Sequence, residues 1–152
     1  MKNNNYSEIL LRAVYWRLNQ AGNVFDPQTR PQGTLNGTPL YSIYVPKNAK
    51  YPYILLDYPA LDDFSTKTED GQSGSMQITA FDQSDSAARV SDFMKTIYLT
   101  LQNFDFDFSL FNTRNLDFSS VQLTDFRVRN TSLDILEKDT VMGSMNCFFS
   151  LI

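Results

Sequence analysis

All six prolines of the 152-residue chain lie within 33 residues, from Pro27 to Pro59. Proline lacks a backbone N–H and disfavours the interiors of helices and central strands. We therefore expect this stretch to be irregular, whereas the proline-free flanks can be regular throughout. A folded chain of this length buries roughly 70% of the surface that it exposes when unfolded, so residues 1–152 are predicted to form one domain with one core.

Two helices are predicted, one on each side of the proline-rich stretch. Residues 6–18 place apolar side chains at the i, i+3, i+4, i+7 spacing of a helix with one buried stripe. Residues 85–102 repeat this spacing, and Ser84 or Asp85 can cap the helix. Residues 19–39 are rich in Gly, Asn, Thr and Pro and are predicted to form a long loop or an insertion.

The other regular segments are predicted to be strands, at 40–45, 53–58, 64–67, 75–81, 121–130 and 141–151. The segments 64–67 and 75–81 flank a turn-rich sequence at 68–74, which predicts a hairpin. Alternation in 121–130 changes phase near Thr124, which indicates a β-bulge. The order helix, strands, helix, strands predicts an α+β domain. Its mostly antiparallel sheet should have four or more strands, with both helices packed on one face.

Histidine is absent and Cys147 is the single cysteine. This composition excludes histidine-dependent nucleophile systems, most zinc and haem sites, and an intrachain disulfide. Cys147 falls on the apolar face of the last predicted strand, so we expect a small buried side chain. No apolar run reaches the ~18 residues of a membrane-spanning helix, and residues 1–5 lack the apolar segment of a signal peptide. The expectation is a soluble, non-enzymatic protein of a reducing compartment, without a metal or cofactor.

Two polar motifs were weighed as sites. Gly71-Gln72-Ser73-Gly74 has no lysine and precedes a strand, whereas a phosphate cradle needs a helix N-terminus, so a hairpin turn is predicted. A metal site would need convergent oxygen ligands. The preferred interpretation of the candidate carboxylates is a solvated face, and they are Asp62, Asp63, Asp105 and Asp107.

Charge is distributed unevenly along the chain. Residues 1–50 carry a net charge of +4, residues 51–152 carry −8, and the whole chain carries −4. This balance, without a basic cluster, argues against a nucleic-acid binder held by phosphate contacts. An acidic surface can nevertheless face DNA without gripping it.

Phenylalanine is concentrated in residues 104–118, which hold five of the twelve in the chain. The simpler interpretation is a core strand and its neighbours. The functional alternative is an aromatic contact stripe against another subunit, because buried aromatic side chains dominate interface energetics. The interface candidates are Phe104, Phe106, Phe108 and Phe111.

The order of motifs along the chain is also informative. Residues 40–46 read Leu-Tyr-Ser-Ile-Tyr-Val-Pro and residues 51–56 read Tyr-Pro-Tyr-Ile-Leu-Leu. An acidic hairpin sequence, the strand 75–81, a Ser-rich segment at 82–86 and an amphipathic helix follow. With the first helix, this order resembles the tail-terminator, or tail-completion, family of tailed bacteriophages over roughly half of the chain. The C-terminal third matches that family only as strands.

The resemblance implies a structural protein without catalytic residues. Family members have an α+β fold whose sheet edges pair between subunits to close a ring, commonly a hexamer, that caps the tail tube and joins it to the head-side connector. The implied partners are other copies of the chain, the tail-tube and connector proteins, and DNA that passes through the lumen without specific binding. The implied location is the head–tail junction of the virion, after assembly in the host cytoplasm, with no membrane involved.

Two alternatives stay open. One is a ring of more subunits in the head–tail connector of a short-tailed phage. The other, from a different class, is a small cellular α+β module with a ligand under residues 19–59. The side chains that could line that pocket are Tyr41, Tyr44, Tyr51, Tyr53 and Tyr58.

Overall fold

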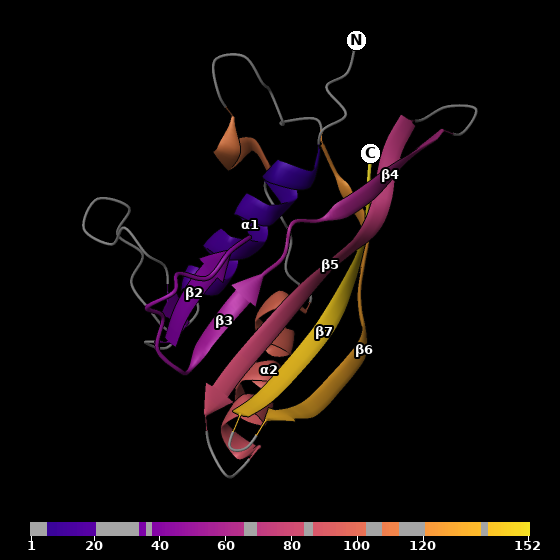
Figure 1. Cartoon of the computed structure of the whole chain (residues 1–152). Coiled ribbons are helices and arrows are strands. Elements are labelled where there is room, and N and C mark those ends of the chain that lie inside the picture. Colours follow the sequence, from indigo (N-terminus) through magenta and orange to yellow (C-terminus); the bar gives the residue numbers. More distant parts are fainter. Residues whose placement is uncertain are drawn as a thin grey trace.

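The structure, a computed structural model, describes residues 6–20, 34–35, 38–65, 70–83, 87–102, 108–112, 121–137 and 140–152. Two helices pack on one face of a seven-stranded sheet (Figure 1). This arrangement confirms the predicted α+β class. In chain order the elements are α1 (Tyr6–Gln20), β1 (Thr34–Leu35), β2 (Thr38–Ser42), β3 (Tyr53–Leu56), β4 (Ala60–Ser65), β5 (Asp70–Gln83), α2 (Ala88–Leu101), the 3-10 helix η1 (Phe108–Phe111), β6 (Leu123–Glu137) and β7 (Thr140–Leu151).

The sheet has the order β1-β2-β3-β5-β7-β6, and all its neighbours are antiparallel except β2 and β3. Strand β5 is the axis of the sheet. One of its edges pairs with β7 along most of its length, and the other edge pairs with β3 at one end and β4 at the other. The short strands β3 and β4 therefore lie one after the other along the same edge of β5, and each covers only part of its length.

Strands β5 and β7 pair without a register shift from Gln72↔Leu151 to Gln83↔Thr140. Alternation buries every second residue of β7 and, from Met76 to Asp82, of β5, as the period of a half-buried strand predicts. The predicted buried face of the last strand is confirmed. Its members are Val141, Gly143, Met145, Cys147, Phe149 and Leu151.

The proline-rich half departs from the predicted boundaries. Strand β2 ends at Ser42 instead of continuing to Val45, because Ile43 has a φ of 72°, which extended backbone does not allow. Its start lies at Thr38, and Thr34–Leu35 pairs with it, so part of the predicted 19–39 loop is a strand pair. Strand β3 is four residues long and follows a cis Tyr51–Pro52 peptide bond.

The predicted hairpin forms, but its loop was placed wrongly. Strands β4 and β5 pair from Ala60↔Ser75 to Ser65↔Asp70, so Gly71 and Gly74 lie inside the ladder. The predicted bulge in the 121–130 segment is confirmed, since the β6–β7 register shifts between Leu123 and Asp125.

Both predicted helices are present. The stripe of α2 is buried at Val90, Met94, Ile97 and Leu101. Tyr98, which the predicted spacing also places on that stripe, four residues after Met94, is 40% exposed. The predicted cap is wrong. Residue Ala87 is the N-cap and makes no side-chain cap hydrogen bond, while residues 84–86 lie outside the described part of the chain. Within the described ranges, neither helix has the length and apolar character needed to cross a bilayer.

Candidate subunit interface

The phenylalanine-rich segment is described only in part. Phe104 and Phe106 lie outside the described residues, and the side chain of Phe111 is likewise not described. Phe108 opens η1, and its side chain is 1% exposed. Its assignment as an interface candidate is therefore corrected to a core residue, because a ring buried within its own subunit offers no surface to a neighbour. Phe104, Phe106 and Phe111 stay predicted contacts.

A groove of about 460 Å³ runs beside the outer face of α1. Tyr15 is held there by its hydroxyl, which donates a hydrogen bond to the carbonyl oxygen of Leu40 at 3.1 Å. Glu8 and Arg12 form an exposed ion pair at 2.6 Å, so their charges offset each other. The lining is mainly apolar and consists of Leu11, Tyr15, Trp16, Ser42, Ile43 and Tyr58, with Glu8 and Arg12 completing it.

The predicted tyrosine pocket is not formed as one site. Tyr58 lines the groove beside α1, whereas Tyr41, Tyr51 and Tyr53 gather on the opposite, helix-free face of the sheet. There the Tyr53 ring centroid lies 5.3 Å from that of Tyr51 and 5.1 Å from that of Phe81. Burial, followed by its tyrosine neighbours, raises the pKa of Tyr53. These rings pack on one another.

Exposed apolar side chains are concentrated after β2 and β3. Ile43 is 59% exposed and Tyr44 is 71% exposed, and Tyr51 and Tyr58 are also exposed. Ile43 lines the groove as well, so the groove and this exposed segment are continuous. Apolar surface of this kind is typical of protein contacts. The segment is therefore the best candidate for a subunit interface among the described residues.

Sequence reasoning missed a buried carboxylate at the end of β5. Asp82 is 1% exposed, and its Oδ1 accepts a hydrogen bond from the Gln83 backbone N–H at 2.8 Å. Arg89, in the first turn of α2, places its Nε 3.4 Å from Oδ2. This contact ties the end of β5 to the start of α2. Alternation could have found it, because Asp82 continues the buried series of Met76, Ile78 and Ala80.

No catalytic constellation is assembled in the described part of the chain. Cys147 is 0% exposed, and burial raises the pKa of its thiol to about 12, so the reactive thiolate is strongly disfavoured. Asp62 and Asp63 lie exposed on β4, whereas Asp105 and Asp107 fall outside the described residues. Across those residues, no three His, Cys, Asp or Glu side chains converge in a way that could hold a metal ion.

Comparison with known proteins gives a structural likeness. No protein-family model and no curated protein matches the chain. Among solved structures, the chain is similar to a chain of the virion of a native gene transfer agent particle. The likeness has a TM-score of 0.70 and 18% sequence identity, and it covers 97% of each chain. At this identity the likeness establishes a shared fold over essentially the whole of both chains.

Proposed function

We propose that the chain is a structural protein of a phage-type virion, where it forms a ring that terminates the tail tube and joins it to the head-side connector. The observation that carries the proposal is the whole-length fold likeness to a virion chain. The order of motifs in residues 1–102, which resembles tail terminators, supports the same role independently of that likeness.

Features of the sheet suit assembly into a ring. In the described residues, β1, β4 and β6 each have one edge without a strand partner. Unpaired strand edges are templates for pairing with another chain. A ring closes through heterologous contacts, in which one patch meets a different patch on the next subunit. Six copies are expected, as in the family that the sequence resembles.

The charge of the chain suits a passage for DNA. Residues 51–152 carry a net charge of −8. Like charge on the lumen wall repels phosphate and leaves few counterion-releasing contacts, so DNA is expected to slide past without binding. The absence of histidine and the inert Cys147 agree with a role that needs no chemistry.

Electron microscopy of purified particles tests the proposal, with the chain located by a bound antibody fragment. The expected result is a closed ring of six copies at the head–tail junction. Particles assembled without the chain should show separate heads and tails, and supplying the wild-type chain should restore joining. A ring of about twelve copies would instead support a connector role in a short-tailed phage. A single copy, an open filament, or absence from the particle would contradict the proposal.

A further inference from the structure

Two exposed regions of opposite charge carry an inference about how copies of the chain meet. The first, here called the basic flank, is residues 43–51, which connect β2 to β3. It contains Lys47 and Lys50, both exposed, and no acidic residue. Ile43, Tyr44 and Tyr51 in the same segment are exposed apolar or aromatic side chains. The flank therefore combines two positive charges with exposed apolar and aromatic side chains.

The second region, here called the acidic hairpin, is the β4–β5 hairpin from Ala60 to Ser75. Asp62, Asp63 and Asp70 are exposed on it. Residues 66–69, which follow β4 in the sequence, add one lysine and one glutamate, so residues 60–75 carry a net charge of −3. In the described part of the chain, none of these three aspartates and neither flank lysine has an ion-pair partner.

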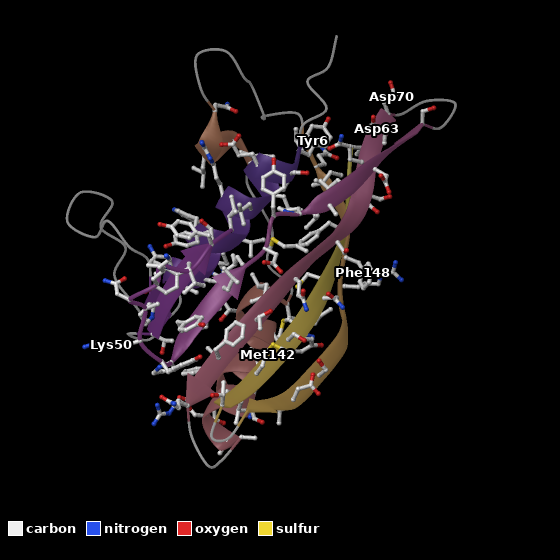
Figure 2. All side chains as sticks on the ribbon, viewed as in Figure 1. Tyr6, Lys50, Asp63, Asp70, Met142 and Phe148 are labelled. Carbon is white, nitrogen blue, oxygen red and sulfur yellow. The ribbon has the colours of Figure 1, made fainter. Side chains whose placement is uncertain are left out.

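Lys50 and the aspartates of the hairpin lie near opposite ends of β5, whereas the basic flank begins at Ile43, whose backbone N–H donates to Leu56 near the middle of the sheet. Tyr53, just after the basic flank, pairs with Phe81 of β5, whereas Phe64 of the acidic hairpin pairs with Gly71. Ten residues of strand separate these positions, which places them about 30 Å apart along β5. Figure 2 shows Lys50 at one side of the molecule and Asp63 and Asp70 at the other. Lys50 of one copy is therefore too far from Asp63 and Asp70 of the same copy to pair with them.

We infer that the basic flank of one copy docks on the acidic hairpin of the next copy, and that this contact closes the ring. The inference rests on the proposed function for the existence of a ring, and it adds the two surfaces that meet. Complementary patches on different parts of one chain define a heterologous contact that repeats from copy to copy. Charge complementarity would set the register, and the apolar side chains of the flank would form the dry centre.

Charge reversal tests this contact. A flank-reversed chain carries Lys47→Glu and Lys50→Glu, and a hairpin-reversed chain carries Asp62→Lys and Asp70→Lys. Asp63 is left unchanged because its Oδ1 accepts a 2.7 Å hydrogen bond from Gln72, which also accepts one from the Tyr6 backbone N–H. Each reversed chain alone should lower the number of complete rings per particle by about tenfold, because like charges then face each other. A chain with all four substitutions should recover to within about twofold of wild type.

A matched control separates contact from net charge. Asp92 on α2 and Asp134 on β6 are exposed aspartates outside both regions. Asp92→Lys and Asp134→Lys, added to the flank-reversed chain, restore the same net charge as the four-substitution chain and should not restore rings. Recovery in this control, wild-type ring numbers in either reversed chain, or failure of the four-substitution chain would overturn the inference. If the wild-type chain is absent from particles, the proposed function fails instead. Urea unfolding of each isolated chain checks that all variants fold equally well.

Discussion

The two halves of the sheet are built in different ways. In the half formed by β5, β7 and β6, long strands pair antiparallel beneath α2, with twelve consecutive register pairs between β5 and β7. In the other half, β1, β2 and β3 are two, five and four residues long, include the one parallel pair of the described sheet, and lie beneath α1. The first half, here called the regular half, is built on the unbroken β5–β7 ladder, although the β6–β7 register shifts at three places. The second, proline-rich half is interrupted by proline and by a residue with positive φ.

This difference suggests that one half of the sheet stabilises the fold and the other contacts other molecules. The regular half buries its alternating face fully, from Ile78 on β5 to Met145 on β7. The proline-rich half instead leaves Ile43, Tyr44 and Tyr51 exposed next to two lysines. Binding surfaces commonly sit on irregular segments that a rigid scaffold positions. Substitutions in the regular half should therefore change stability, and those in the basic flank should change assembly.

The largest effect is expected at Gly143, where β7 passes directly beneath α2. A Cβ added there would lie 2.6 Å from Val90 Cγ1 and 3.0 Å from Met94 Cγ. Gly143→Ala should therefore push α2 away and lower the free energy of unfolding by about 1–3 kcal/mol. Urea denaturation followed by circular dichroism measures the change.

A double-mutant cycle identifies the cause. Val90→Ala removes the nearest methyl group, so the double variant should be less destabilised than the sum of the two single changes by at least ~0.5 kcal/mol. Tyr44→Ala, in the basic flank, should stay within about 0.5 kcal/mol of wild type. If the Gly143→Ala chain is as stable as the Tyr44→Ala chain, the expected difference in sensitivity between the two halves is wrong.

A second prediction concerns pH and the interior of the regular half. Burial raises the pKa of Cys147 from 9.0 to about 12, so the folded chain holds this proton more tightly than the unfolded chain. The contribution of this thiol to the free energy of unfolding is therefore fully present below pH 9, and it is lost as the pH rises from 9 toward 12. At pH 10 the loss is about 1.4 kcal/mol.

Unfolding of the wild type and of Cys147→Ala, measured between pH 8 and 10, tests the second prediction, because Tyr6 and Tyr53, whose pKa values are also raised, contribute equally in both proteins. Cys147→Ala should lower stability at every pH and show a flatter decline above pH 9. The native thiol should also resist modification by a thiol reagent until the chain unfolds. Equal slopes in the two proteins would show that water reaches this part of the core.

Much of the regular half could be predicted from the sequence because one period governs each element. The alternation of residues 141–151 gave the buried face of β7, and the 3.6-residue spacing gave the stripes of both helices. Errors arose where backbone pairing overrode local turn signals. Gly71 and Gly74 suggest a loop, yet the ladder between β4 and β5 continues through both.

The candidate interface was harder to predict because it depends on tertiary placement. Phe108 and its neighbours form one run of aromatic residues in sequence, and no local signal separates a core ring from a surface ring. The charges of the basic flank and acidic hairpin are visible in sequence, but their separation follows only from which part of β5 each neighbouring strand pairs with. Asp82 was missed because the strand was predicted to end at residue 81, although Asp82 continues its buried alternation.

The smallest expected change in stability is at Ile43. There, a single substitution should change stability and assembly in opposite directions. A β-branched residue with φ of 72° is strained, because its Cβ crowds the following carbonyl oxygen. Asparagine tolerates this conformation, and the 59% exposed Ile43 side chain loses little burial on replacement. Ile43→Asn should therefore raise the free energy of unfolding by about 0.5–1 kcal/mol. Tyr44→Asn, at a neighbouring position without a positive φ, is the control and should not stabilise the chain.

If Ile43 belongs to the subunit contact, the same substitution should weaken assembly while it strengthens the fold. Ring counts in particles carrying Ile43→Asn should fall severalfold, because an apolar side chain at the centre of the contact is replaced by a polar one. Strained residues persist where the surrounding structure or a function holds them, which gives a reason for isoleucine at this position. Stabilisation without loss of rings would place Ile43 outside the contact. If Ile43→Asn neither stabilises the chain nor lowers the ring counts, Ile43 is neither strained nor part of the contact. The proline-rich half would then differ from the regular half only in its strand lengths.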